Sequence, residues 1–179
     1  MPVGFPEALP YVMRTFRRVE PRTVLDIGCG YGFWGAVLRN YFGTDPRTGS
    51  IFPLMQVGIV GVEIWPAYRN PMWDLYNGVI VGRIEDHLDL VSSADLVVAI
   101  DVIEHLPERL GERILQTAKA FVMGVPRERP QGAHYGNEAE RHLSFWNADD
   151  VRRFATTVTV LERVNPEVNP GVDYIIGEK

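Results

Sequence analysis

The sequence has little cysteine and no long hydrophobic run. Cys29 is its one cysteine, so a disulfide within the chain is excluded. No charged-then-apolar signal segment opens the chain, and we expect a protein of the reducing cytoplasm. No apolar run approaches the ~18 residues that span a bilayer. We therefore expect a soluble protein without a membrane partner.

The composition is that of a globular protein. Apolar residues make up 46% of the 179 residues, while 17 glycines and 13 prolines are too few for a disordered or low-complexity chain. We expect a single domain over residues 1–179. The formal net charge is −5. The chain has no net positive charge that would attract nucleic acid, so a nucleic-acid partner would have to bind to a local positive patch.

Short apolar, β-branched runs alternate with segments of helical period, which predicts βαβ units and a parallel sheet. A turn-rich break between the last two runs predicts a C-terminal hairpin. The expected strands are 22–27, 56–63, 78–82, 95–100, 120–125, 156–164 and 172–177; the expected helical segments are 6–19, 33–42, 66–76, 85–90, 108–118 and 147–154. A long loop at 43–55 is expected to contain a small hairpin.

A glycine turn follows the first expected strand. The segment from Val24 to Gly32 reads VLDIGCGYG, and a helix is expected directly after it. Glycines at such a corner let the backbone approach a ligand, and the helix N-terminus offers free N–H groups. The alternative is a tight turn without a ligand.

Glu63 ends the next expected strand, in the segment Gly61-Val62-Glu63-Ile64-Trp65. If the two strands are neighbours, its carboxylate lies beside the glycine turn, where it can accept both hydroxyls of a ribose. The alternative is a solvated acid at a strand end. A dinucleotide turn would need glycine where this chain has Phe33, and no Gly-Lys-Ser/Thr follows for a phosphate loop.

These segments, together with ADLVVAIDVIEHLP at residues 94–107, resemble the class I S-adenosylmethionine-dependent methyltransferases over nearly the whole chain. The resemblance implies an α/β, Rossmann-like doubly wound sheet of seven strands in the order 3-2-1-4-5-7-6. Five strands would be parallel, strand 7 would be antiparallel in a C-terminal β-hairpin, and helices would cover both faces. The implied cofactor is S-adenosylmethionine, with S-adenosylhomocysteine as product.

The resemblance also implies cofactor contacts. The glycine turn would border the methionine part of the cofactor, Glu63 would hold the ribose hydroxyls and Ile64 would pack on adenine. The expected contacts are Asp26, Gly28, Cys29, Gly30, Glu63, Ile64, Ile84 and Asp101. One departure stands out: many members have Asp after the third strand, near the adenine amino group, whereas this chain has Arg83, which cannot accept a hydrogen bond. Glu85, Asp86 or the Ile84 backbone would have to replace it.

Asp101, Glu104 and His105 follow the fourth expected strand, at the edge where open α/β sheets bind ligands. His105 and the later His142 are the candidate catalytic residues, because an imidazole titrates near neutrality and can act as a general base. For Glu104 the alternative role is a favourable charge at a helix start.

The segment from Asp101 to His105, together with the segment from Arg141 to Trp146 that contains His142, is also similar to small-RNA 2′-O-methyltransferases. In that family, carboxylates and histidines bind a divalent metal beside the acceptor hydroxyl. The match is partial, because Asp101 stands where that family has Glu and its second histidine near the later site is absent. We assign no metal from the sequence.

The loop over residues 126–146 follows the fifth expected strand and is placed to cover an acceptor. It carries His134, Tyr135, Asn137, Glu138, His142 and Trp146. From the sequence, we expect a methyltransferase with a small-molecule acceptor. The alternatives are methylation of RNA, with or without a metal, methylation of a protein, or a cofactor-binding module without catalysis. The sequence predicts no oligomeric state.

Overall fold

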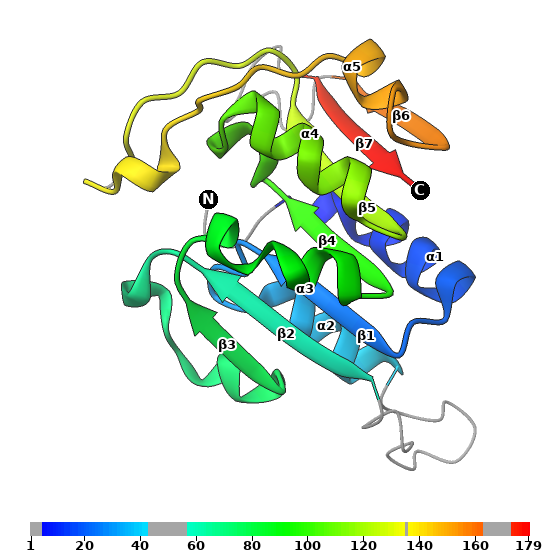
Figure 1. Ribbon diagram of the computed structural model, residues 1–179, viewed down its shortest axis with the longest axis vertical. Helices are drawn as coiled ribbons and strands as arrows, with labels where there is room; N and C mark the ends of the chain where they lie inside the picture. Colours follow the sequence, from blue (N-terminus) through cyan, green and yellow to red (C-terminus); the bar gives the residue numbers. More distant parts are fainter. Residues whose placement is uncertain (1–4, 43–56, 135, 163–172) are drawn as a thin grey trace.

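The computed structural model describes residues 5–42, 57–134, 136–162 and 173–179. Its described strands form one sheet of seven strands in the order β3-β2-β1-β4-β5-β7-β6 (Figure 1). The strands are β1 (Thr23–Ile27), β2 (Gly58–Glu63), β3 (Gly78–Val81), β4 (Leu96–Ile100), β5 (Phe121–Pro126), β6 (Thr157–Leu161) and β7 (Tyr174–Glu178). Strands β1 to β5 are parallel and β7 is antiparallel to both of its neighbours. The predicted fold class and strand order are confirmed.

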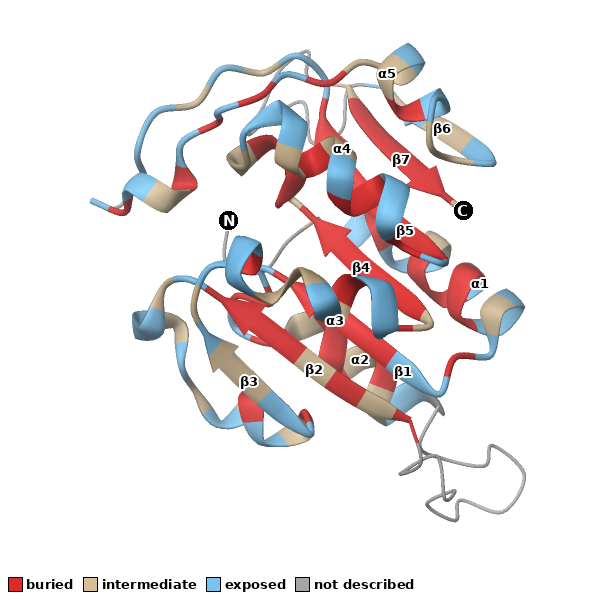
Figure 2. Ribbon diagram, in the orientation of Figure 1, coloured by how far each residue is buried: buried red, intermediate tan, exposed pale blue. Residues whose placement is uncertain are grey.

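Helices cover both faces of the sheet. Their bounds are α1 (Leu9–Val19), α2 (Phe33–Phe42), α3 (Leu88–Ser93), α4 (Glu108–Thr117) and α5 (Ala148–Arg152). Helices α1 and α2 pack on one face in one hydrophobic cluster, and α3, α4 and α5 pack on the other face in a second cluster. The middle strands are buried while the outer sides of the helices are exposed (Figure 2). This pattern is expected for a parallel sheet covered on both faces.

The register of β1 against β2 places the two predicted cofactor features together. Ile27 at the end of β1 is paired with Val62, and the backbone N–H of Gly28 donates to the Val62 carbonyl at 2.8 Å. Glu63 is the next residue of β2. The glycine turn and the carboxylate therefore meet at one edge of the sheet, as predicted.

The segment between β2 and β3 differs from the prediction of one helix over 66–76. The structure has two 3-10 turns there, Pro66–Tyr68 and Pro71–Leu75. Pro71 is the physical reason, since proline lacks the N–H that an α-helix needs and disfavours helical geometry at Asn70 before it. The Asn70 side chain instead accepts a hydrogen bond from Met72 N–H and begins the second turn.

Other differences from the prediction concern helix bounds. The predicted opening helix begins with a 3-10 turn, Pro6–Ala8, before α1. The predicted turn at 85–90 is a 3-10 turn, Ile84–His87, that continues into α3. Asn147 caps α5 as predicted, but that helix ends at Arg152. The predicted hairpin at 43–55 lies outside the described residues. No described helix has the length and apolarity to cross a bilayer.

Candidate functional site

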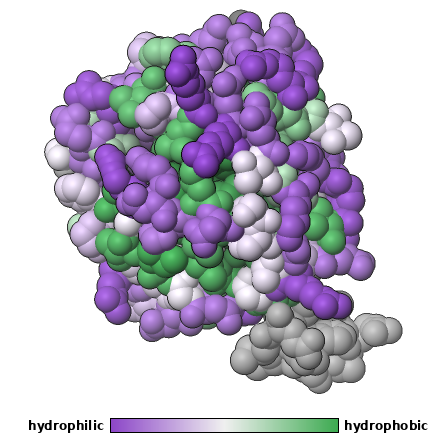
Figure 3. Space-filling view, viewed as in Figure 1, coloured by the Kyte–Doolittle hydropathy of each residue, from purple (hydrophilic) through white to green (hydrophobic). Residues whose placement is uncertain are grey.

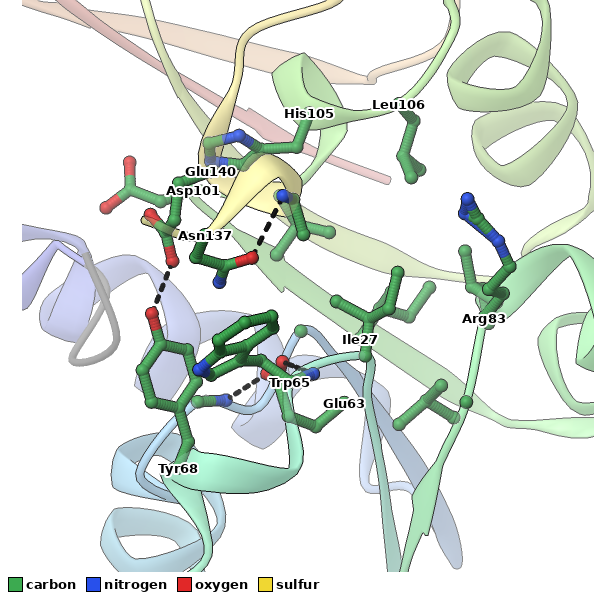
Figure 4. A pocket seen from close by; sticks show the side chains of 18 of the residues that line it. Ile27, Glu63, Trp65, Tyr68, Arg83, Asp101, His105, Leu106, Asn137 and Glu140 are labelled. Carbon is green, nitrogen blue, oxygen red and sulfur yellow. Dashed lines mark hydrogen bonds between the residues drawn. The ribbon is translucent and has the colours of Figure 1, made fainter. Parts of the chain in front are cut away.

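A cavity of about 560 Å³ opens at the carboxyl ends of β1, β2, β3 and β4. Its size lies within the range of small-molecule sites. The lining includes the glycine turn, the ends of β2 and β3, the segment after β4, and a 3-10 turn, Glu138–Glu140, from the loop after β5. In Figure 4, Tyr68, Asp101 and Glu140 gather at one end of the cavity, while Arg83 and Leu106 lie at the other. Figure 3 shows apolar side chains in the middle of this face between hydrophilic ones.

The backbone of the glycine turn takes left-handed conformations at Gly28 (φ 64°) and Gly30 (φ 52°), and both residues line the cavity. At Gly28 the need for glycine is also steric. A Cβ atom there would lie 2.5 Å from Cγ2 of Val102, which packs against the turn from the segment after β4. The turn can hold this shape and still border the cavity only with glycine at position 28.

Glu63 lies at the junction of the turn and β2, and its carboxylate is buried. One carboxylate oxygen accepts the N–H of Gly30 at 2.8 Å, and the other accepts the N–H of Trp65 at 2.8 Å. Burial raises the pKa of Glu63, and these two N–H donors oppose the rise. An ionised carboxylate has about four acceptor positions. The backbone uses at least two of them, and the remaining capacity can accept a hydroxyl group of a ligand in the cavity.

Asp26 and Cys29 belong to the predicted set but do not line the cavity. The Asp26 carboxylate lies beneath the turn, where one oxygen accepts the Tyr76 hydroxyl at 2.5 Å and the other has no hydrogen-bond partner among the described residues. Burial raises the pKa of Asp26 to about 7, against the lowering effect of the Tyr76 hydrogen bond. The Cys29 thiol is also buried and faces β2 at Gly61. A cofactor contact through either side chain stays a prediction.

Ile64, Arg83 and Ile84 line the end of the cavity beside β3. Ile84 is buried at the start of its 3-10 turn, and Ile64 is exposed, so each offers apolar surface to a flat base. Arg83 is the residue that departs from the family pattern. Among the described residues its guanidinium pairs with Glu85, at 3.7 Å, and Glu85 also lines the cavity. Of the three predicted acceptors for an adenine amino group, Glu85 and Ile84 line the cavity and Asp86 does not, and the contact stays a prediction.

Asp101 lines the opposite end of the cavity, directly after β4. Its backbone is left-handed, with φ 56°, and one of its carboxylate oxygens accepts the Tyr174 hydroxyl at 2.7 Å. Burial raises the pKa of Asp101 to about 6, while the Tyr174 hydrogen bond lowers it.

Glu104, His105 and His142 form one cluster, in which one carboxylate oxygen and one nitrogen of each ring lie within 4.8 Å of one another. His105 lines the cavity, and the His142 ring lies 4.8 Å from it between centroids. The structure thus joins both predicted catalytic histidines with Glu104. Asp101, the fourth residue of the metal hypothesis, is not part of this group.

The ring nitrogens of the cluster have defined roles. Nδ1 of His105 lies 3.2 Å from the carbonyl oxygen of Arg141, and Nδ1 of His142 lies 2.6 Å from that of Arg129. A carbonyl can only accept, so each Nδ1 carries the proton and each Nε2 presents a lone pair. The two imidazoles therefore present electron pairs, the chemistry that suits a divalent cation.

Burial favours the neutral form of all three groups. Glu104 is buried, and one of its carboxylate oxygens has no hydrogen-bond partner among the described residues. Burial, together with the nearby Asp101 charge, raises the pKa of Glu104 well above its ordinary value. Burial and the neighbouring His142 lower the pKa of His105 to about 4, and burial lowers that of His142. Both imidazoles are therefore neutral at pH 7, as metal ligands must be.

No protein-family model and no curated protein matches the chain. Solved structures do match. The methyltransferase domain of bacterial CtHen1 has a TM-score of 0.56 at 17% identity, covering 97% of this chain and 98% of that one. The N-terminal domain of EvdMO1 with S-adenosylhomocysteine bound has a TM-score of 0.64 at 12% identity, covering 98% and 81%. A SAM-dependent methyltransferase from Archaeoglobus fulgidus has a TM-score of 0.55 at 18% identity, covering 96% and 94%.

The chain has the fold of the class I S-adenosylmethionine-dependent methyltransferases. In this methyltransferase fold the candidate site includes residues that the sequence analysis missed. Trp73 is one of them: its indole N–H donates to the Gly30 carbonyl at 2.8 Å, while Glu63 accepts the N–H of Gly30 at 2.8 Å. Both backbone polar groups of Gly30, its N–H and its carbonyl, are thereby fixed. Pro71, two residues before Trp73, was the sequence signal that this segment leaves helical geometry.

The later loop of the methyltransferase fold is also an ordered part of the site. From Glu140 to Trp146 every second residue is buried. The backbone N–H groups of Leu143 and Ser144 both donate to the Glu104 carbonyl, at 2.8 and 3.0 Å. The Ser144 hydroxyl donates to the Ile103 carbonyl at 3.2 Å and accepts the Trp146 indole N–H at 2.9 Å. These bonds hold His142 beside Glu104. Hydrophobicity did not mark this alternation, because the buried Glu140, His142 and Ser144 are polar while the exposed Leu143 and Phe145 are apolar.

Glu140 and Tyr68 are the other missed residues. The Tyr68 hydroxyl donates to Glu140 at 2.7 Å and joins the β2 side of the cavity to the later loop. This hydrogen bond lowers the pKa of Glu140 against the effect of burial. Of the residues predicted to cover an acceptor, Asn137 and Glu138 line the cavity, and Trp146 is buried behind it. His134 pairs with Asn137 and does not line the cavity; Tyr135 lies outside the described residues.

Proposed function

We propose that this chain is an S-adenosylmethionine-dependent methyltransferase with a small-molecule acceptor. The observation that carries the proposal is the contact of Glu63 with the glycine turn inside the cavity. Its remaining acceptor capacity suits the hydroxyls of a ribose. The bound cofactor supplies a methyl group on a positively charged sulfur. The residues described here bind and orient it, and they exclude water from its surroundings.

The charge of the cavity supports a small-molecule acceptor over a polyphosphate. Its lining carries five carboxylates, from Glu63, Glu85, Asp101, Glu138 and Glu140, and one guanidinium, from Arg83. The net charge of the chain is also negative, at −5. Both would repel the phosphates of an RNA strand. The buried thiol of Cys29 is in keeping with a cytoplasmic location, which we also propose.

Calorimetry with S-adenosylmethionine and S-adenosylhomocysteine tests the proposal. We expect both ligands to bind to the wild type. Glu63→Ala should weaken binding at least about tenfold, because hydrogen bonds to a charged group are worth roughly 1.5–3 kcal/mol each. Asp89→Ala, which removes an exposed carboxylate from α3, is the matched control and should bind normally. Absence of heat with both ligands, or unchanged affinity in Glu63→Ala, would refute the proposal.

The cluster of Glu104, His105 and His142 supports a second candidate, metal-assisted methylation of a hydroxyl. The unpartnered Glu104 oxygen and the two Nε2 lone pairs fit Mn²⁺ or Mg²⁺. A bound divalent ion would lower the pKa of an acceptor hydroxyl. Without one, His105 is the candidate base that lines the cavity, but burial lowers its pKa to about 4, so it is a weaker base than the near-neutral imidazole that the sequence predicts. The resemblance to small-RNA 2′-O-methyltransferases makes a ribose hydroxyl of RNA the alternative acceptor.

Titration with Mn²⁺ separates these possibilities. We expect binding by the wild type and loss of binding in His142→Ala, with the affinity for S-adenosylhomocysteine unchanged because His142 does not line the cavity. Wild-type protein that binds no Mn²⁺ and keeps its turnover after chelation would contradict the metal role. For RNA, a short single strand should show affinity that falls steeply with salt. A flat response would exclude nucleic acid as the acceptor.

A further inference from the structure

Asp101 has a backbone conformation that needs an explanation. It is one of three non-glycine residues with a left-handed φ among the described residues, at 56°. Such a conformation is unfavourable for a residue with a Cβ atom, and it persists only where the surroundings hold it. Here the N–H of Asp101 donates to the Gly124 carbonyl at 2.9 Å, which ties the residue to the end of β5. The strained residue also lines the cavity.

Tyr174 holds the side chain of Asp101. Its hydroxyl donates to the carboxylate at 2.7 Å, although Tyr174 belongs to β7, beyond β5 in the sheet. The ring can cross β5 because position 124 is glycine: a Cβ there would lie 2.7 Å from both Cε1 and the hydroxyl oxygen of Tyr174. On its other side the ring stacks on Phe5, with centroids 3.7 Å apart. Tyr174 is therefore locked in place and fixes one carboxylate oxygen of Asp101.

The position of Asp101 along the cavity indicates which part of the cofactor it faces, if the proposed function holds. Glu63 fixes the ribose between the ends of β1 and β2. The base then extends toward β3, where Ile64 and Ile84 offer apolar surface. The reactive end must extend the other way, over Gly28 and toward β4, where Asp101 and His105 line the cavity. That end carries the positively charged sulfur in S-adenosylmethionine and a neutral sulfur in S-adenosylhomocysteine.

We propose that Tyr174 positions the Asp101 carboxylate to face the positive charge of the methyl donor, so that the site binds the donor in preference to its demethylated product. This inference rests on the proposed function. Asp101 contributes the negative charge, and Tyr174 acts through Asp101 as a positioning residue. The pair would favour release of the product once the sulfur has lost its charge.

The test is the ratio of the dissociation constant of S-adenosylhomocysteine to that of S-adenosylmethionine, measured by calorimetry. Asp101→Asn keeps the side-chain shape and tolerates the left-handed backbone, and it should lower this ratio by at least about fivefold. Tyr174→Phe removes only the hydroxyl and should lower the ratio in the same direction. In the Asp101→Asn background, Tyr174→Phe should cause no further change, since coupled residues are not additive.

Thr15→Val is the matched control. It deletes a buried hydroxyl that donates to the Glu178 carboxylate on the same strand, away from the cavity. It should lower the thermal stability and leave the ratio unchanged. Equal weakening of both ligands in Tyr174→Phe and in Asp101→Asn would overturn the inference while leaving the proposed function intact. Binding of neither ligand by the wild type would overturn both. If Tyr174→Phe fails to fold, the ratio in Asp101→Asn still decides the assignment of the charge.

Discussion

Replacing the buried carboxylate beneath the glycine turn should change how the stability of the protein depends on pH. Asp26 is 1% exposed, and its pKa is raised to about 7, first by burial. In the unfolded chain an aspartate titrates near 3.9. The raised pKa means that folding favours the protonated form. This carboxyl therefore imposes no penalty below about pH 4, a growing penalty from pH 4 to 7, and a constant penalty above pH 7.

The magnitude follows from the shift. About three pKa units at 1.36 kcal/mol each give a penalty of roughly 4 kcal/mol above pH 7, as an upper value. Asp26→Asn has no charge to bury. Its free energy of unfolding should therefore rise relative to the wild type by about 2–3 kcal/mol between pH 5 and pH 7 and then stay parallel. Urea unfolding at pH 5, 6, 7 and 8, followed by tryptophan fluorescence, measures this difference.

The difference in free energy of unfolding between Asp26→Asn and the wild type isolates the effect of Asp26 from that of the other groups with shifted pKa values. Asp101 contributes with the same sign, and His105, whose pKa is lowered, contributes with the opposite sign, but both remain in the variant. Asp95→Asn is the control, because the pKa of Asp95 is lowered and its effect should be confined to acid pH. If the new amide in Asp26→Asn lacks a hydrogen-bond partner, the free energy of unfolding would fall by the same amount at every pH, and its dependence on pH would not change. Parallel wild-type and Asp26→Asn curves from pH 5 to pH 8 would refute the reasoning.

Two further substitutions test the framework of the site. Gly28→Ala should lower the free energy of unfolding by about 1–3 kcal/mol, because the residue is left-handed and its Cβ would lie 2.5 Å from Val102. Urea unfolding measures this loss, and an unfolding midpoint equal to that of the wild type would contradict the steric argument. Ser144→Ala should lower the free energy of unfolding by about 1–3 kcal/mol, because it leaves the Trp146 indole N–H without its hydrogen-bond partner. A loss of Mn²⁺ affinity with unchanged stability would contradict a structural role for this hydroxyl.

The parts of the fold that follow from local pattern were predictable from the sequence. Apolar, β-branched runs marked all seven strands, and the resemblance supplied their order. The meeting of Glu63 with the glycine turn followed from the parallel arrangement of β1 and β2, and the structure confirms that contact. The predicted helix at 66–76 was wrong because its apolar spacing was given more weight than Pro71.

The contacts between distant segments were not predictable in this way. The hydrogen bond from Trp73 to Gly30 joins residues 43 positions apart, and that from Tyr174 to Asp101 joins residues 73 positions apart. Each depends on where a loop or a strand crosses its neighbours, which periodicity does not encode. The burial of Glu140 was missed for a related reason, since its pairing with Tyr68 forms only when the later loop meets the β2 side of the cavity.

The double anchoring of the Gly30 backbone has a consequence for any attempt to divide this protein. A fragment ending before residue 60 would keep all the glycines of the turn, yet it would lack both the carboxylate that accepts the Gly30 N–H and the indole that donates to the Gly30 carbonyl. Such a fragment would have the glycine motif without the contacts that hold the turn in its folded conformation. Complementation by a second fragment that begins near β2 and carries Glu63 and Trp73 should restore the turn.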